Sequence, residues 1–385
     1  MSTKSNTLFG FDLTVIPLSL AYSLAFCSNT FLPIWLPGMA KIFGVNSAQI
    51  GLVGSLELGS IAVSSILTAH FAKHAGIRSR ITIAILVNIV ANSVTSLAPS
   101  LLILALLRAV VGLANGVLFA DTVRAAAGMR NPRTTFSVQQ FVLVLFAILF
   151  FSNVPFLMGH FGVAAPFWFS AALGVLAAIS LPLLQVAPKP VVQHHAAGGK
   201  PSRLSMPVLL IFASSLTAFC IQAGTWATIG LAGTRVGMPL AVLAKLFAVA
   251  SFVMLAVPFM VEGIGDRLGR MTPFALGFGV LAVSEWLIGG QLDPFLFSAG
   301  VIGLNLAAMF LGPFSMALLV EYDPSGTSAA AGPAIIMLGA STGPAVAGIL
   351  LRLVGSSGFA AAGVASCLTA FALVVLSRRH HRAIA

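Results

Sequence analysis

Twelve long apolar runs determine the architecture that this chain can adopt. A helix needs about 20 apolar residues to cross the roughly 30 Å hydrocarbon core of a bilayer. Runs of that length, separated by charged or proline- and glycine-rich breaks, occur at about 11–37, 48–70, 79–98, 100–120, 135–158, 164–187, 206–231, 239–261, 271–290, 294–319, 328–353 and 358–377. A β-barrel would instead show shorter segments of alternating polarity. We therefore predict an all-α integral membrane protein with twelve transmembrane helices.

The composition also favours a bilayer. Of the 385 residues, 58% are hydrophobic and only 8% are charged, which is too little polar surface to cover a soluble globule of this size. The first run contains Asp12, exceeds the length of a signal-peptide core and lacks a small-residue cleavage site. We expect it to remain as the first helix.

The basic residues predict the orientation of the chain. Cytoplasmic loops retain lysine and arginine during insertion, and with a cytoplasmic N-terminus 15 of the 20 basic residues fall in cytoplasmic segments. We expect both termini in the cytoplasm, in a multi-pass protein of the cell membrane such as a bacterial inner membrane. The net charge of +11 is spread over short loops beside the helices, which favours contact with the lipid bilayer over binding to nucleic acid.

One long polar stretch, "VAPKPVVQHHAAGGKPSRLS" at 186–205, interrupts the apolar runs. Its prolines, paired glycines and basic residues are typical of a flexible linker. We predict six-helix bundles at 1–187 and 206–385, joined by a cytoplasmic linker at 188–205. The pair His194 and His195 lacks further metal ligands in sequence, so a solvated linker is favoured over a metal site. We expect no metal and no cofactor.

Two loops indicate an internal repeat. "AHFAKHAGIRSRI" follows the second run and "VEGIGDRLGRM" follows the eighth, so each basic loop stands two helices into its half. Asp266, Arg267, Gly269 and Arg270 in the second loop resemble the loop signature of the major facilitator superfamily. "LLRAVVGLANG" in the fourth run and "GASTGPAVAG" in the eleventh are similar to glycine patterns of the same family. In the first loop, Lys73 stands where the family usually has an acid.

The resemblance implies two pseudo-symmetric six-helix bundles that rock about one central site. It also places the loop after helix eight against the start of helix five, and the first basic loop near the acidic pair between helices ten and eleven. We expect ion pairs at both places to form a cytoplasmic gate; the alternative is that the charges only set topology. The predicted gate residues are Lys73, Arg78, Arg130, Arg133, Asp266, Arg267, Arg270, Glu321 and Asp323.

Glu57, Arg108 and Glu285 lie within apolar runs and are predicted proton-coupling residues, because hydrocarbon makes ionisable groups costly. We expect Glu57 to hold a proton in apolar surroundings and to release it when water or a cation arrives; the alternative is an acid satisfied by a backbone carbonyl. Arg108 resembles the fourth-helix arginine of the family, which implies proton coupling or recognition of substrate charge; the alternative is a structural hydrogen-bond hub. The peripheral ninth helix of the family favours a structural role for Glu285.

The family resemblance also implies where substrate binds. It places the cavity between helices one, four, seven and ten, with contributions from two, five, eight and eleven. Amides offer hydrogen-bond donors and acceptors without fixed charge, and aromatic rings offer apolar faces. For each one, helix–helix contact is an equal alternative. Together with Arg108, the predicted contacts are Tyr22, Asn29, Trp35, Asn115, Gln139, Gln140, Gln222, Trp226 and Asn305.

The predicted function is transport of a small-molecule substrate, an organic solute, by alternating access. The sequence contains no GxxxxGK[ST] loop for ATP, so protons are the expected energy source. The fifth run lacks the glycine–proline pattern of drug antiporters, which favours proton-coupled symport; efflux of a drug or metabolite is the alternative. No HExxH spacing or Ser/His constellation lies in the runs, which argues against a membrane enzyme. A transporter-like sensor is a further alternative. We expect a monomer.

Overall fold

The computed structural model describes residues 7–8, 11–71, 76–129, 131–185, 205–264, 269–290, 293–323 and 327–384. Apart from two short strands, the regular structure of these residues is helical. The strands β1 (Thr7–Leu8) and β2 (Phe11–Asp12) pair antiparallel. The first helix therefore begins at Val15, slightly later than predicted, and Asp12 accepts the backbone N–H of Thr14 at 2.9 Å.

The helices follow the predicted runs closely. They are α1 (Val15–Phe43), α2 (Ser47–Phe71), α3 (Ile77–Thr95), α4 (Leu101–Ala127), α5 (Pro132–Phe161), α6 (Ala165–Ser180), α7 (Met206–Arg235), α8 (Leu240–Met254), α9 (Val257–Ile264), α10 (Thr272–Gly289), α11 (Pro294–Tyr322) and α12 (Thr327–Ile384). Short 3-10 turns occupy Gly162–Ala164 and Leu181–Leu183.

Ten segments of the described chain are long and apolar enough to cross a membrane. Two of them, Thr134–Leu183 and Ala331–Arg382, are 50 and 52 residues long. Each contains a break at a glycine with positive φ, Gly162 in the first and Gly355 in the second, at φ 57° and 68°. Glycine tolerates this conformation because it has no Cβ. When each long segment is counted as two spans, the total agrees with the twelve predicted helices.

Large apolar side chains cover the outer faces of the helices. Phe71 is 72% exposed, and Leu102 and Ile179 are each 69% exposed. A soluble protein rarely exposes so many large hydrophobes together, whereas lipid tails are as apolar as these side chains. The chain is a multi-pass membrane protein.

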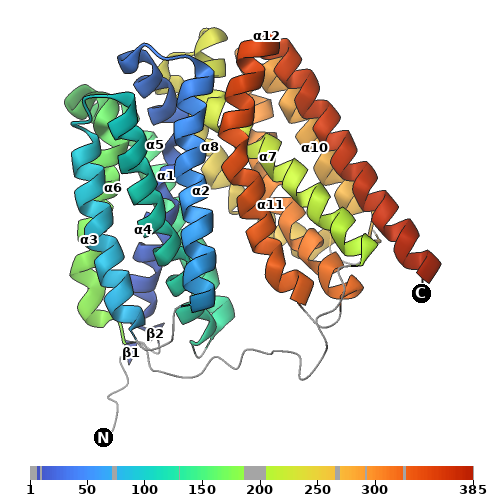
Figure 1. The fold of residues 1–385 in the computed structure, drawn as a ribbon, viewed down its shortest axis with the longest axis horizontal. Helices are drawn as coiled ribbons and strands as arrows, with labels where there is room; N and C mark the ends of the chain where they lie inside the picture. Colours follow the sequence, from blue (N-terminus) through green and yellow to red (C-terminus); the bar gives the residue numbers. More distant parts are fainter. Residues whose placement is uncertain are drawn as a thin grey trace, which may run out of the picture. The chain divides into compact units, whose positions relative to one another are not determined.

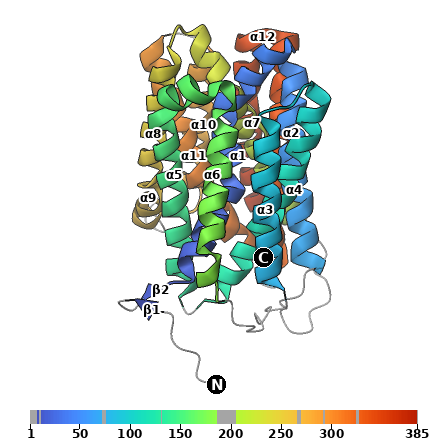
Figure 2. The same ribbon diagram turned by 90° about the vertical axis from the view of Figure 1, so that its left-hand side faces the viewer.

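The chain divides into two compact units, one of residues 1–35 and 56–193, the other of residues 36–55 and 194–385. In the first unit, α3 packs against α4 and α6 (Figure 2). In the second unit, α10 packs against α11 and α12, and α12 also packs against α7 (Figure 1). The predicted linker at 188–205 lies almost entirely outside the described residues.

The second unit includes the end of α1 and the start of α2, which pack closely on α12. The backbone N–H of Ala345 donates to the Ser55 hydroxyl oxygen at 2.9 Å. A Cβ atom at Gly51 would lie only 2.3 Å from the carbonyl oxygen of Pro344. Only a glycine allows the two backbones to approach so closely.

Candidate functional site

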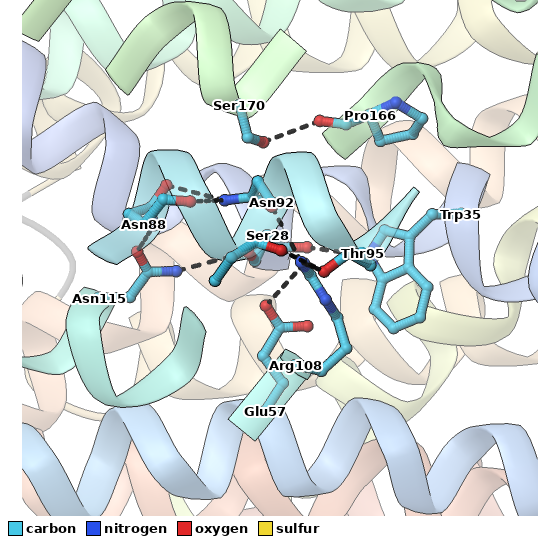
Figure 3. Close-up of polar contacts among 11 residues, drawn as sticks. Ser28, Trp35, Glu57, Asn88, Asn92, Thr95, Arg108, Asn115, Pro166 and Ser170 are labelled. Atoms are coloured by element: carbon cyan, nitrogen blue, oxygen red, sulfur yellow. Dashed lines mark hydrogen bonds and ion pairs between the residues drawn. The ribbon is translucent and has the colours of Figure 1, made fainter. Parts of the chain in front are cut away.

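Arg108 on α4 and Glu57 on α2 form a buried ion pair in the first unit (Figure 3). The distance from Arg108 Nη1 to Glu57 Oε1 is 3.5 Å, and each side chain is 1% exposed. Arg108 Nη2 donates to Asn92 Oδ1 at 3.0 Å and to Thr95 Oγ1 at 2.7 Å. One acid and two neutral acceptors on α3 therefore hold the guanidinium group inside the bundle.

Close packing of α2 against α4 positions this pair. Gly112 lies one helical turn after Arg108, and a Cβ atom there would stand 2.3 Å from the carbonyl oxygen of Glu57. One turn further, a Cβ atom at Gly116 would stand 2.4 Å from the carbonyl oxygen of Ile61. Glycines four residues apart let membrane helices approach closely. The glycine pattern of the fourth run thus brings the Glu57 carboxyl group within reach of the guanidinium.

A chain of amides leads from Arg108 across the unit to α1. Asn92 Nδ2 donates to Asn88 Oδ1 at 2.8 Å, and Asn88 Nδ2 donates to Asn115 Oδ1 at 2.6 Å. Asn115 Nδ2 donates to the Ser28 hydroxyl at 3.4 Å. Such connected networks couple the positions of their members, because moving one group leaves its partner unpaired.

Aromatic rings cover one side of the guanidinium. The Arg108 Cζ atom lies 4.5 Å from the centroid of the Phe167 ring on α6. Trp35 packs against Phe167 with ring centroids 5.8 Å apart. The ring face attracts the cation, and this attraction is stronger where water is excluded.

The ion pair retains unused hydrogen-bonding capacity. Among the described residues, neither Glu57 Oε2 nor Arg108 Nε has a hydrogen-bond partner. Buried polar atoms without partners are rare, and each calls for an explanation such as a water molecule, an ion or a functional role. Chemically, a proton on Glu57 would remove the charge that holds Arg108 and free the guanidinium to take other partners.

The predicted substrate contacts of the first unit differ in their surroundings. Trp35 and Asn115 belong to the network around Arg108. Tyr22 packs against Phe26 on α1, with ring centroids 4.9 Å apart. Gln139 on α5 is completely buried, yet neither atom of its amide has a hydrogen-bond partner in the described part of the chain.

Three further predicted contacts have other surroundings. The carbonyl oxygen of Gln140 also lacks a partner among the described residues. Asn29 on α1 and Gln222 on α7 are both partly exposed.

Three more predicted site residues lie in the second unit, namely two substrate contacts and the proton-coupling candidate Glu285. Trp226 on α7 packs against Phe247, with ring centroids 5.6 Å apart. The Asn305 amide on α11 donates to the carbonyl oxygen of Val301 at 2.9 Å, one turn earlier on its own helix. Glu285 is buried on α10. The structure thus gathers Trp35, Asn115, Arg108 and Glu57 in one network. Trp226, Asn305 and Glu285 do not belong to it.

Two acidic gate residues have partners within the second unit. We expected Glu321 and Asp323 to meet Lys73 or Arg78, of which Lys73 lies outside the described residues. Glu321 pairs with Arg270, and the two side chains are 33% and 56% exposed. Asp323 Oδ2 accepts the N–H of Ser328 at 2.9 Å, and the Ser328 hydroxyl donates to the same oxygen at 2.7 Å.

The rest of the predicted gate is mostly outside the described residues. Lys73, Arg130, Asp266 and Arg267 fall in undescribed segments, as does the side chain of Arg133. Arg78 lies in the first turn of α3 and is exposed.

An ion pair that the sequence analysis missed joins α3 to α4. Arg80 Nε donates to Asp121 Oδ2 at 2.7 Å, and Arg80 Nη2 donates to Asp121 Oδ1 at 2.8 Å. Asp121 is completely buried, whereas the Arg80 side chain is 25% exposed. Bidentate pairing of this kind is specific to the planar guanidinium group. Asp121 lies just beyond the predicted fourth run. An acid so close to an apolar run could have been identified from the sequence.

Five neutral members of the network around Arg108 were not predicted from the sequence. Asn92, Thr95 and Phe167 contact Arg108 directly, whereas Asn88 and Ser28 belong to the chain of amides. Asn88 and Asn92 stand four residues apart in an apolar run, so both lie on one face of α3. That spacing could have identified them.

Comparison with known proteins agrees with this architecture. The model of the Major Facilitator Superfamily matches residues 18–332. Similar solved structures include a bacterial homologue of the human lysosomal transporter Spinster, inward-facing and occupied (TM-score 0.71, 13% identity, covering 95% of this chain and 96% of that chain). They also include the nucleoside transporter NupG (0.73, 13%, 96% and 99%) and the peptide transporter POT in complex with sulfate (0.76, 15%, 99% and 97%).

At these identities the likeness to solved structures concerns the fold. No curated protein sequence matches the chain. The family model, however, covers most of the chain and includes α2, α3 and α4, which carry the ion pair and its partners. The chain therefore belongs to the major facilitator superfamily, and it is a secondary transporter rather than an enzyme.

Proposed function

We propose that this transporter carries a small organic solute together with protons, as a symporter, by alternating access. The observation that supports the proposal is the buried pair of Glu57 and Arg108, with its unpaired carboxylate oxygen. Ionisable groups at membrane depth are costly, and they mark ion and proton pathways in transporters.

Glu57 is the proposed proton carrier, with Arg108 as its fixed counter-charge. When Glu57 is ionised, the guanidinium compensates its charge in a site that excludes water. When Glu57 takes up a proton, Arg108 loses that attraction but keeps Asn92 and Thr95 as partners. The two protonation states thus leave Arg108 with different partners on α2 and α3, and a difference of this kind is what coupling to a conformational equilibrium requires.

The substrate contacts proposed for the first unit centre on Gln139 and Gln140. A buried amide with no partner costs about 1–3 kcal/mol, so a ligand or water that satisfies it contributes to binding. The Gln139 amide offers both a donor and an acceptor, and we propose a solute that carries an amide-like edge. Transporters of the same fold include one for nucleosides and one for peptides, and both of these solute classes carry such edges.

We also retain the cytoplasmic gate and the orientation as proposals. The gate comprises the loop with Asp266 and Arg267, facing Arg130 and Arg133. An exposed ion pair contributes only about 0–1 kcal/mol, but several such pairs can shift an equilibrium between two states. Both termini are proposed to be cytoplasmic. Asp266→Asn should change the labelling of cysteines placed on the two faces; an unchanged distribution would count against the gate.

The decisive test is a solute screen on the reconstituted protein with an imposed pH gradient. In Glu57→Gln we expect the gradient to lose its ability to drive accumulation, while exchange of labelled for unlabelled solute continues. Arg108→Ala should impair both. Glu262→Gln, which neutralises an exposed acid on α9, is the matched control and should behave as the wild type.

The two flux measurements separate the outcomes. Accumulation at the full wild-type rate in Glu57→Gln would refute the carrier assignment. Export of solute in exchange for protons would replace symport by efflux. Specific binding of a solute without any flux would favour the sensor.

A further inference from the structure

The second unit holds its own buried acid without a cation. Glu285 on α10 is 1% exposed, and the Thr225 hydroxyl on α7 donates to its Oε2 atom at 2.6 Å. Its Oε1 atom has no hydrogen-bond partner in the described part of the chain, and no Lys, Arg or His of that part forms an ion pair with it. An ionised carboxylate in such a place is expensive. The neutral acid is therefore the form suited to this site.

The surrounding helices leave room for the carboxyl group and add little charge. A Cβ atom at Gly363 on α12 would lie 2.9 Å from Glu285 Oε2. Cys367, one turn further along α12, is the neighbouring titratable group. The only charged residue of α11, Glu321, lies in its last turn. The nearby basic residue of α7 is Arg235, at the end of that helix.

A small cavity lies one helical turn from this acid on all three helices. Residues three or four apart share one face of a helix. On α7 the step runs from Thr225 to Thr228, and on α10 from Glu285 to Ile288. On α12 it runs from Gly363 back to Phe359. Its lining includes Thr228, Ala232, Arg235, Ile288, Ser356 and Phe359.

The cavity has room for water. Its volume is about 20 Å³, and one water molecule needs roughly 10–15 Å³. At its rim, the exposed side chain of Arg235 donates to the Ser356 hydroxyl at 2.6 Å. Ser356 follows Gly355, where α12 breaks. The cavity thus lies between the end of α7 and the residues around the acid, and its lining on each helix stands one turn, about 5 Å, from those residues.

We propose that Glu285 is a second proton-binding site, which exchanges its proton through this cavity with the side of the membrane where α7 ends. The inference rests on the proton coupling proposed above and extends it to the second unit. Water enters past Arg235 and exchanges the proton at the unpaired Oε1 atom. The Thr225 hydroxyl donates to Oε2 in both protonation states.

The test is infrared spectroscopy of the full chain in lipid nanodiscs, without substrate. The wild type should show a carbonyl band of a buried carboxylic acid that is absent in Glu285→Gln and shifts when H2O is replaced by D2O. Ala232→Leu fills the cavity and should slow that shift about tenfold, or ~1.4 kcal/mol of barrier. Ala213→Leu makes the same change at an exposed position of α7 and should leave the rate unchanged.

Two results would overturn the proposal. One is a spectrum in which Glu285→Gln removes no band; the other is an exchange rate in Ala232→Leu equal to that in Ala213→Leu. If Glu285→Gln fails to fold, Gly363→Ala replaces it, because the added methyl group presses on the carboxyl group and should move the band. The measurement involves neither solute nor Glu57, so its failure leaves the first carrier site standing, and a failed flux test leaves this result interpretable.

Discussion

The stability of the Glu57 and Arg108 pair provides the sharpest test of the site. At the observed 3.5 Å and an effective dielectric constant of about 20, two unit charges attract by about 5 kcal/mol. Glu57→Leu removes the acid but leaves a guanidinium group that cannot lose its proton. We expect this variant to lose about 3–5 kcal/mol of unfolding free energy, as other broken buried pairs do.

The matched variants separate charge from packing. Arg108→Met leaves a carboxyl group that can take up a proton, so its loss should be smaller. The double variant replaces the whole pair by apolar side chains and should be more stable than Glu57→Leu alone. Urea unfolding in detergent micelles, followed by tryptophan fluorescence, measures all three. A loss below about 1 kcal/mol in Glu57→Leu, the value of a solvated pair, would refute the buried ion pair.

Three other contacts give direct predictions. Arg80→Ala should cost about 3 kcal/mol of unfolding free energy, because it leaves the buried Asp121 carboxylate without its partner. Arg80→Lys should recover less than half of the resulting fall in melting temperature, because lysine cannot form the bidentate pair. Gly51→Leu should cost about 1–3 kcal/mol through overpacking against the Pro344 carbonyl; an unchanged melting temperature would contradict the close approach. Asp323→Ala should cost about 1 kcal/mol, because it removes the acceptor of the Ser328 N–H in the first turn of α12. It should also speed hydrogen exchange in that turn, whereas Asp323→Asn should not.

The sequence predicted the helices well because hydrocarbon thickness fixes their length. Every predicted span has a counterpart, and the break between α8 and α9 lies just before Pro258. The apolar pattern is much weaker at showing which face of a span points inward. Lipid tails are as apolar as the protein interior, so the pattern of hydrophobic residues does not separate the two faces.

The site shows the same limit residue by residue. Glu57 and Arg108 were identified because charge at membrane depth is conspicuous in any sequence. Their pairing was not, because it depends on the closeness of α2 and α4 at Gly112. The neutral partner Phe167 is one of 29 phenylalanines, and nothing in its local sequence distinguishes it. Charged residues within apolar runs can be identified from the sequence, whereas their apolar neighbours are known only from the fold.

The tight seat of Gly112 against the Glu57 backbone has a mechanical consequence. With a clearance that leaves no room for a methyl group, the middle of α2 and the middle of α4 move as one piece. Protonation of the Glu57 carboxyl group therefore acts on two helices together and not on one mobile side chain. A single carbon added at Gly112 would separate the two helices and uncouple them.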